Sequence, residues 1–370
     1  MVVLASLLLL IITLFIGIPV PFAFFASALL IIIFKGYDPS FLLPYGYSKM
    51  STLVLLAIPL FILAGGLMEK GKIGDKLVDL VDVLVGRIRG GLGAVMVFSC
   101  AVFGTITGSA AATQTVIGTI MLRRLEEAGY PKAISASLLA SSAVLGMLIP
   151  PSTIMILYSW IGNQSVLASF LSSIIPGVIL AVLLSLCNAW LLRNNENIVL
   201  REKMNIKTFG KEFTNKTITA LPALIMPVLV LGGIYGGIVT PTVAAAIAVL
   251  YAIPIGLYIY KGLNGKKIVN VIIESATTTG VIMIMLYSVM ILSRLYIMED
   301  LPGIIMSFLN NISSSKYVMM LMINVFMIII GMLMDDVSAV LLCTPVLLPV
   351  VTKIGISPVH FAAIIGVNLG

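Results

Sequence analysis

The chain has 370 residues, of which 60% are hydrophobic and 10% are charged, and its mean hydropathy is +1.17. A soluble domain carries about 25% charged residues, so this composition excludes a soluble globular protein, and apolar runs of 17 or more residues predict an all-α polytopic membrane protein. The net charge of +7 comes from basic loops and predicts contact with membrane lipid and no nucleic acid.

The basic residues indicate which side of the membrane each loop occupies. Seventeen of the 22 lysines and arginines fall in four segments, 70–89, 123–132, 193–216 and 261–267. The positive-inside rule places these segments in the cytoplasm. The apolar block 2–34 is expected to be two short helices joined at the sequence GIPVP, with the N-terminus outside. The spans expected after it are 50–68, 133–160, 168–192, 217–236, 237–260 and 269–293.

The pattern of the first half recurs in the second half. Residues 17–36 and 237–262 both open on Gly-Ile with a nearby proline and close on an aromatic residue followed by Lys-Gly. A basic amphipathic arm, 70–89, is expected at the inner surface, and an arm with two acidic residues, 294–316, is expected outside. The halves therefore run in opposite directions across the membrane, which is the inverted-repeat architecture of many secondary transporters.

The stretch FGTITGSAAATQT (103–115) is polar but uncharged within apolar sequence. Both sides of this region are cytoplasmic, and two helices of about 15 residues are too short to cross a core of ~30 Å. We therefore predict a re-entrant helical hairpin with its tip near residues 104–113. Hydroxyl and carbonyl oxygens there suit a hard cation, and the N-terminus of the second helix suits a carboxylate. The alternative is a packing face of small residues.

Two further features follow this hairpin. Pro150-Pro151 interrupts the apolar segment 141–159 and predicts a broken helix, as expected beside a site at the membrane midplane. In the second half, Asp335-Asp336 is an acidic pair within apolar sequence and marks an ion pathway. A shift of 227 positions places Gly104 on Gly331, which makes the acidic pair the tip of a second hairpin. The alternative is an outer loop between two complete spans.

Several motifs in one order resemble the large membrane subunit of TRAP (tripartite ATP-independent periplasmic) transporters. They are IPLFILAGGLMEKGKIGDKLVDLV (58–81), RGGLGAVMVFSCAVFGTITGSAAAT (89–113), LIPPS (148–152), GGIYGGIVTPTVAAAIAVLYA (232–252) and GMLMDD with PVLLPVVTKIGISPVHF (331–361). The resemblance covers essentially the whole chain. The family's Ser-Gly-Ser tip is Thr107-Gly108-Ser109 here, and its closing Thr-Pro-Pro motif would lie beyond Gly370, so the chain is expected to end before that motif.

The resemblance implies an elevator-type permease of the bacterial or archaeal inner membrane. It implies Na⁺-coupled import of a carboxylate such as a C4-dicarboxylate or sialic acid. It also implies two partners, a four-helix small membrane subunit and a periplasmic substrate-binding protein. An ion channel with the same re-entrant hairpins is the alternative. An intramembrane enzyme is disfavoured because the sequence has no Ser/His or HExxH arrangement.

The expected sites follow from the hairpins and the broken helix. The first Na⁺ site is expected at Gly104, Thr107, Ser109, Ile149, Pro150 and Ser152. The second Na⁺ site is expected at Gly331, Asp335 and Asp336. The substrate carboxylate is expected between the two tips, at Gly108, Ser109, Thr113, Pro151 and Asp336, and Arg294 is expected to contact a partner. No organic cofactor and no metal other than Na⁺ is expected.

These expectations divide the chain into seven segments: first-repeat scaffold helices (1–68), an inner arm (69–88), the first transport half (89–160), a connecting span and cytoplasmic loop (161–216), second-repeat scaffold helices (217–293), an outer arm (294–316) and the second transport half (317–370).

Overall fold

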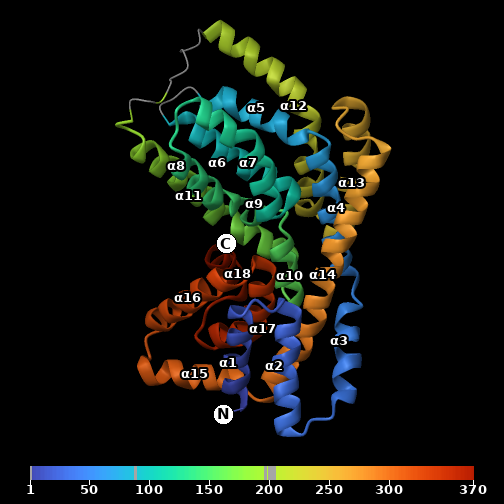
Figure 1. Cartoon of the computed structure of the whole chain (residues 1–370), viewed down its shortest axis with the longest axis vertical. Helices are drawn as coiled ribbons and strands as arrows, with labels where there is room; N and C mark the ends of the chain where they lie inside the picture. The colour runs from blue at the N-terminus through green and yellow to red at the C-terminus, as the bar shows by residue number, and fades with distance from the viewer. Residues whose placement is uncertain (1, 87–89, 196–197, 199–205) are drawn as a thin grey trace. The chain divides into compact units, whose positions relative to one another are not determined.

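The computed structural model describes residues 2–86, 90–195, 198 and 206–370, and the regular secondary structure in these ranges is entirely helical (Figure 1). Seven helices of the described chain are long and apolar enough to cross a membrane. They include α4 (Ala57–Lys70) extended by a preceding 3₁₀ turn, α14 (Gly265–Met298) and α16 (Lys316–Leu333). The expectation of an all-α polytopic membrane protein is therefore confirmed.

The chain divides into two compact units, which we describe separately. The first unit contains Met1–Leu56, Ile154–Ser172 and Thr277–Gly370, and the second contains Ala57–Thr153 and Ser173–Ala276. Three helices contribute residues to both units: α10 (Thr153–Ile161), α11 (Val166–Leu191) and α14.

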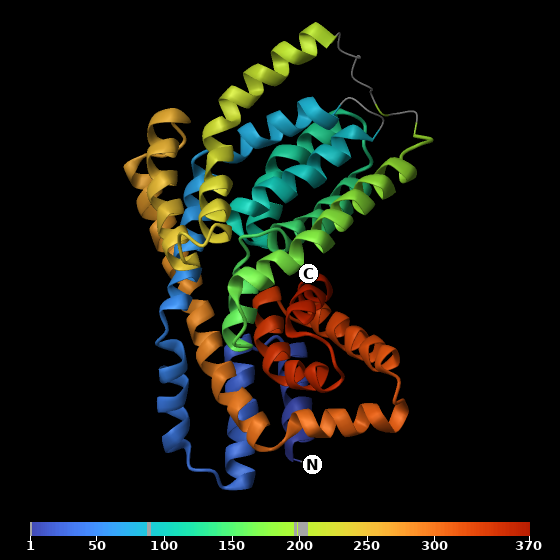
Figure 2. The same ribbon diagram turned by 180° about the vertical axis from the view of Figure 1, so that it is seen from behind.

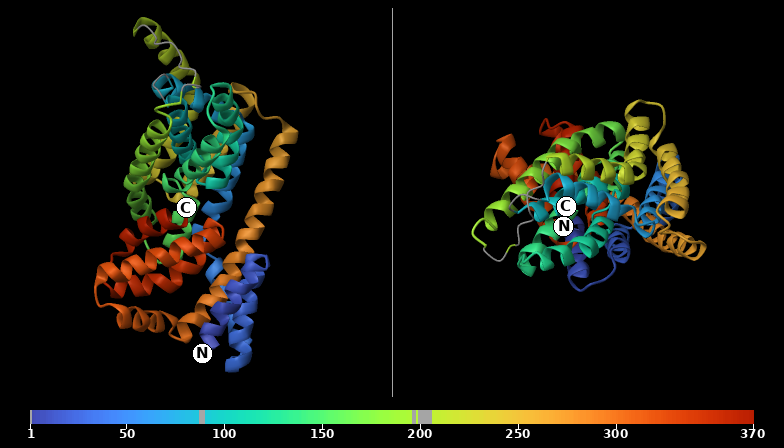
Figure 3. Two further views of the ribbon diagram at one scale, coloured as in Figure 1. Left: turned by 60° about the vertical axis from the view of Figure 1, so that its left-hand side comes forward. Right: turned by 90° about the horizontal axis from the view of Figure 1, so that it is seen from above.

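The first unit begins with the expected pair of short helices. α1 (Val2–Phe15) and α2 (Val20–Lys35) pack side by side (Figure 3). The turn between them contains Gly17 with φ +87° and Pro19, so α1 ends where the sequence predicts the turn. A short helix that the sequence did not predict, α3 (Leu42–Met50), follows a 3₁₀ turn at Pro39–Phe41.

The C-terminal part of the first unit is a group of four helices. It consists of α15 (Leu301–Ile312), α16, α17 (Asp336–Lys353) and α18 (Pro358–Leu369), which lie together in Figure 2. α15 packs on α17, and α18 packs on both α16 and α17. At the start of α15 the Glu299 carboxylate accepts hydrogen bonds from Lys35 Nζ at 2.6 Å and Tyr37 OH at 2.5 Å, which joins this group to the end of α2.

The second unit holds the predicted first hairpin and the helices around it. Its described helices are α4, α5 (Ile73–Val85), α6 (Gly91–Thr107), α7 (Ala110–Glu127), α8 (Lys132–Ala143), α9 (Leu145–Leu148), α12 (Ile206–Tyr235) and α13 (Pro241–Pro254), with a π-helical turn at Ile255–Ile259. α13 packs along α4, α12 packs on α5, and α6 contacts α5, α7, α8 and α9. α6 is buried along nearly its whole length, so it forms the centre of this unit.

Candidate functional site

The turn between α6 and α7 consists of Gly108 and Ser109. Gly108 has φ +59°, in the left-handed region, and its N–H donates to Gly104 O at 2.9 Å. The Ser109 hydroxyl accepts from the N–H of Ala112 at 3.4 Å and caps α7. A helix leaves its last carbonyls and its first N–H groups without partners inside the helix. The turn therefore gathers acceptors from α6 and donors from α7 at one place.

This turn rests on the break between α9 and α10. Prolines at 150 and 151 lack backbone N–H groups, so the helix stops at Leu148 and resumes at Thr153. The N–H of Thr153 donates to Gly108 O at 3.3 Å. A Cβ atom added to Gly108 would lie 2.7 Å from Pro151 O. The α6–α7 turn and the break between α9 and α10 are therefore in direct backbone contact within the second unit.

Two glycines allow this close approach of α6, α7 and α9. A Cβ atom on Gly104 would lie 2.5 Å from the Cα of Gly146 and 3.0 Å from Leu145 O. A Cβ atom on Gly146 would overlap the Oγ1 of Thr113. Any larger side chain at these positions would push the backbones apart.

The hydroxyl groups of Thr107 and Thr113 lie close together behind the α6–α7 turn. The Oγ1 atoms of Thr107 and Thr113 lie 3.1 Å apart, and their side chains are buried. Thr107 Oγ1 also lies 3.4 Å from Phe103 O. A Cβ atom on Gly65 of α4 would lie 3.5 Å from the Thr107 methyl group, so α4 covers Thr107 on another side.

The residues predicted for the first cation site lie on two segments that are in contact through Gly108, Pro151 and Thr153. Gly104, Thr107 and Ser109 come from the α6–α7 turn, and the 149–152 segment comes from the break. Ser152 is fully buried. The Ile149 side chain packs against Gly177 of α11, where an added Cβ atom would lie 3.1 Å from its Cγ1.

The opposite end of the α6–α7 pair is also anchored. Asn188 of α11 is buried and donates from Nδ2 to Gly90 O at 2.9 Å. The Tyr130 hydroxyl, in the turn after α7, accepts from the backbone of Gly93 and Leu92. Burial raises the pKa of Tyr130, and these hydrogen bonds partly offset that effect. Residues from two other parts of the chain, Asn188 and Tyr130, therefore hold the first turn of α6.

A charged cluster ties α7 to its neighbours. The Asp79 carboxylate of α5 accepts from Arg124 Nη2 of α7 at 3.0 Å and from Lys216 Nζ of α12 at 2.9 Å. Burial favours the neutral acid, but the hydrogen bonds and charges of Lys216 and Arg124 prevail, so the pKa of Asp79 is lowered.

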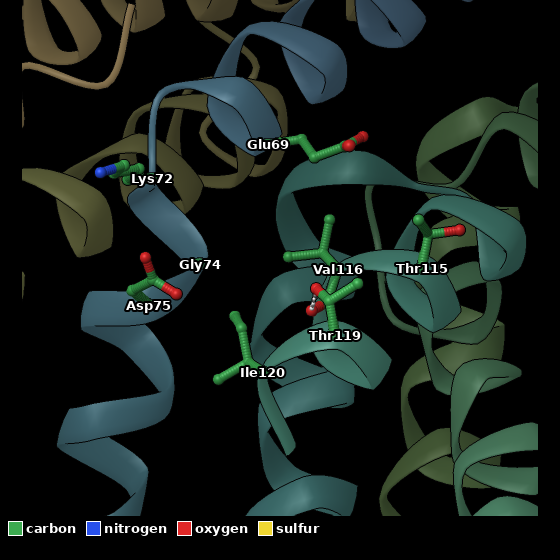
Figure 4. Close-up of a pocket in the computed structure, with 8 residues that line it drawn as sticks. All are labelled: Glu69, Lys72, Gly74, Asp75, Thr115, Val116, Thr119 and Ile120. Atoms are coloured by element: carbon green, nitrogen blue, oxygen red, sulfur yellow. Dashed lines mark hydrogen bonds between the residues drawn. The ribbon is translucent and has the colours of Figure 1, made fainter. Parts of the chain in front are cut away.

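A polar pocket of about 220 Å³ lies between α7, the end of α4 and the start of α5 (Figure 4). In Figure 4, Asp75 of α5 lies across the pocket from Thr119 of α7, Glu69 lies at the end of α4, and Thr115 lines the pocket from α7. The sequence analysis did not predict this pocket. The four-residue spacing of Thr115 and Thr119, which places both on one helix face, is the signal that could have suggested it.

The corresponding turn in the first unit is Met334-Asp335, between α16 and α17. The Asp335 carboxylate caps α17 by accepting from the N–H of Ser338 at 3.2 Å and from the Ser338 hydroxyl. Asp336 is the first residue of α17, and its Oδ1 accepts from the N–H of Val337 at 2.9 Å. The two predicted carboxylates therefore lie at the start of a helix, where its dipole favours negative charge.

Gly331 lies in the last turn of α16 and marks a close contact with α18. A Cβ atom on Gly331 would lie 3.1 Å from Asn368 O and 3.2 Å from the Cα of Leu369. Nearby, Asn368 Nδ2 donates to Asn324 Oδ1 at 2.8 Å, which adds a polar contact between the same two helices.

Arg294, predicted to contact a partner, lies near the end of α14. Its guanidinium carbon is 5.5 Å from the centre of the Tyr45 ring of α3. The Arg294 residue is exposed.

The helices and polar turns define a multi-pass membrane protein. The family model of the tripartite ATP-independent periplasmic transporter, DctM component, matches residues 7–370, and the chain belongs to this family of TRAP large permease subunits. It is a transporter component and not an enzyme.

Individual relatives agree with this assignment. The chain is 35% identical to the uncharacterized protein YgiK of Salmonella typhimurium, over 96% of this chain and 81% of that protein. It is 30% identical to the C4-dicarboxylate TRAP transporter large permease protein DctM of Pseudomonas aeruginosa, over 85% and 73% of the two chains. It is also 30% identical to the sialic acid TRAP transporter large permease protein SiaM of Vibrio cholerae, over 96% and 82%.

The fold is similar to that in the crystal structure of the Alcanivorax borkumensis YdaH transporter. The TM-score is 0.55 at 15% sequence identity, over 86% of this chain and 73% of that chain. At this identity the likeness concerns the fold alone.

Proposed function

We propose that this chain is the large permease subunit of a Na⁺-coupled TRAP transporter that imports a carboxylate across the bacterial or archaeal cytoplasmic membrane by an elevator mechanism. In this proposal a periplasmic binding protein delivers the substrate and a small membrane subunit completes the transporter. Two relatives carry the names of a C4-dicarboxylate and a sialic acid permease, and both named substrates are carboxylates.

The observation that carries the proposal is the backbone contact between the α6–α7 turn and the α9–α10 break. Carbonyls from the last turn of α6, carbonyls freed at the prolines and the hydroxyls of Thr107, Ser109 and Ser152 lie in one region. Na⁺ is a hard ion, and hard cations favour oxygen ligands. In our proposal Gly104, Ile149 and Pro150 supply carbonyl ligands to the first ion.

The dimensions of α7 support a re-entrant hairpin. Its uncharged part, Ala110–Leu122, is followed directly by Arg123 and Arg124. Thirteen helical residues extend about 20 Å, which is short of a membrane core of ~30 Å. With the arginines at the cytoplasmic surface, the turn at Gly108 would lie inside the membrane.

The α16–α17 pair supplies the second ion site in our proposal. Each helix has 18 residues and is long enough by itself to count as a span, so length does not distinguish a re-entrant pair from two crossings. The chemistry of the turn favours an ion site, because Asp335 and Asp336 lie within apolar sequence. Gly331 would contribute its carbonyl.

The substrate carboxylate would bind at the N-terminal end of α7. Gly108 and Ser109 lie where the N–H groups of that helix converge, and a helix N-terminus attracts anions. The Pro151 carbonyl faces the same turn. Asp336 would contribute indirectly, by binding the second Na⁺. Bound Na⁺ would order the turn and add positive charge beside the anion, which supplies a coupling free energy between the two ligands.

Reconstitution of the complete three-component transporter in proteoliposomes tests this function. We expect an inward Na⁺ gradient to drive accumulation of labelled succinate or sialic acid, with little uptake when K⁺ replaces Na⁺. The double variant Thr107→Val/Ser109→Ala should weaken the Na⁺ dependence. Equal uptake in Na⁺ and K⁺ by the wild-type transporter would contradict the proposal.

A further inference from the structure

Both threonines behind the α6–α7 turn are buried, and they lie at different positions in the helix pair. Thr107 ends α6, and its side chain is 3% exposed, whereas Thr113 lies one turn inside α7 and is fully buried. Gly146 covers Thr113 so closely that an added Cβ atom would overlap its hydroxyl. Ser109, in the turn itself, is only half-buried. A substrate approaching the turn therefore meets Ser109 and does not meet Thr113.

The Thr113 hydroxyl lies close to the hydroxyl of Thr107. The two Oγ1 atoms lie 3.1 Å apart, within normal hydrogen-bond distance. The other contact of Thr107, with Phe103 O, is longer at 3.4 Å. Thr113 is therefore the nearer of these two partners of the Thr107 hydroxyl, and either threonine can donate in their contact.

This rotation matters for a cation ligand. A hydroxyl has one proton and two lone pairs, and it can bind Na⁺ only when a lone pair faces the ion and the proton points elsewhere. A hydrogen bond between Thr107 and Thr113 restricts the orientations of the Thr107 hydroxyl before the ion arrives. Such preorganisation reduces the entropy lost on binding.

We propose that Thr113 is a positioning residue of the first Na⁺ site, which orients the Thr107 hydroxyl and does not touch the substrate. This inference rests on the proposed Na⁺-coupled function. It replaces the substrate-binding role that the sequence pattern suggests for Thr113 with a role in ion affinity.

Removal of the Thr113 hydroxyl distinguishes a role in Na⁺ affinity from a role in substrate binding. In the reconstituted transporter, Thr113→Val should raise the half-saturating Na⁺ concentration about three- to tenfold, the effect of losing one hydrogen bond. At saturating Na⁺ the KM for the substrate should be unchanged, and Thr113→Ser should restore wild-type Na⁺ affinity. Thr115→Val is the matched control, because its exposed hydroxyl bonds to Ala111 O of its own helix at 2.9 Å and should not affect Na⁺ affinity.

The outcomes distinguish this inference from the proposed function. If wild-type uptake depends on Na⁺ but Thr113→Val leaves the half-saturating Na⁺ concentration unchanged, the inference is wrong and the function stands. A higher substrate KM at saturating Na⁺, with normal Na⁺ affinity, would instead assign Thr113 to the substrate. If wild-type uptake is independent of Na⁺, both fail. Should the valine variant not fold, Thr113→Ala removes the same hydroxyl without adding bulk, and the same readouts apply.

Discussion

The α6–α7 turn and the α16–α17 turn differ in how they are held. The first is neutral, and backbone contacts that only glycine permits seat Gly104 and Gly108 against the broken helix. The second is charged, and Asp335 caps its own helix through Ser338. The first turn therefore depends on shape and the second on charge, which predicts that added volume will damage the first and loss of charge will damage the second.

Loss of charge at Asp335 should have the largest effect. Asparagine at this position can still cap α17 but carries no charge for an ion. We expect Asp335→Asn to lower Na⁺-driven uptake by about ten- to a hundredfold, the effect of losing a charged ligand. Asp335→Ala should also lower the free energy of unfolding by about 1 kcal/mol, because the cap is lost. Uptake assays and thermal unfolding of the purified protein measure the two effects.

The matched control for this charge is Asp300, which caps α15 by accepting from the N–H of Gly303 at 3.2 Å. Asp300→Asn makes the same chemical change at another helix N-terminus of the first unit and should leave uptake unchanged. Equal losses in the two variants would show that the charge at Asp335 has no special role.

Added volume should damage the α6–α7 turn more than the α16–α17 turn, whereas loss of charge should damage the α16–α17 turn more. Gly104→Ala forces a Cβ atom to within 2.5 Å of backbone, whereas Gly331→Ala meets its nearest atom at 3.1 Å. Overpacking of this kind costs about 1–3 kcal/mol, so Gly104→Ala should lower the thermal stability clearly more than Gly331→Ala. Gly280→Ala, where no atom lies within 4 Å, is the control and should be neutral. A larger loss at Gly331 than at Gly104 would reverse the comparison.

The charged cluster of Asp79, Arg124 and Lys216 should contribute least to the free energy of unfolding. Asp79→Asn removes a partly exposed carboxylate with two basic partners, and such pairs contribute about 1 kcal/mol or less. Because the pKa of Asp79 is lowered in the folded protein, its stabilising effect is fully present above the ordinary aspartate pKa of about 3.9 and is lost as the pH falls through the lowered folded-state pKa. The stability difference between wild type and variant should therefore disappear in acid. Glu127→Gln, which removes an exposed partner of Arg123, should show no difference at either pH.

The sequence predicted the elements that follow from local chemistry. The glycines of the polar stretch predicted a turn near residues 104–113, and the structure places it at Gly108, which has a left-handed angle, and Ser109, which caps α7. Pro150-Pro151 predicted the break because proline cannot continue a helix. The long apolar runs also predicted most of the long helices, although α12 begins at Ile206, eleven residues before the expected start at 217.

The contacts between distant segments were not predictable in this way. Gly146 and Asn188 lie in apolar helices, and nothing local indicates that one seats Thr113 and the other holds Gly90. The polar pocket was missed because Glu69 and Asp75 were interpreted as part of a basic surface arm. Helix α3 was missed because Pro44 and Gly46 disfavour a helix, although Gly46 allows close packing against Tyr287.

The depth of the α6–α7 turn in the membrane tests the account most directly. A spin label can be placed at Ala111, an exposed residue just beyond the turn, and at Glu127 as a reference for the cytoplasmic surface. Collision with oxygen and with a water-soluble nickel reagent then reports the depth of each label in proteoliposomes. We predict that the label at 111 lies near the bilayer centre. A label at the headgroup level opposite Glu127 would show that α7 crosses the membrane, which would contradict a re-entrant hairpin and the ion site built on it.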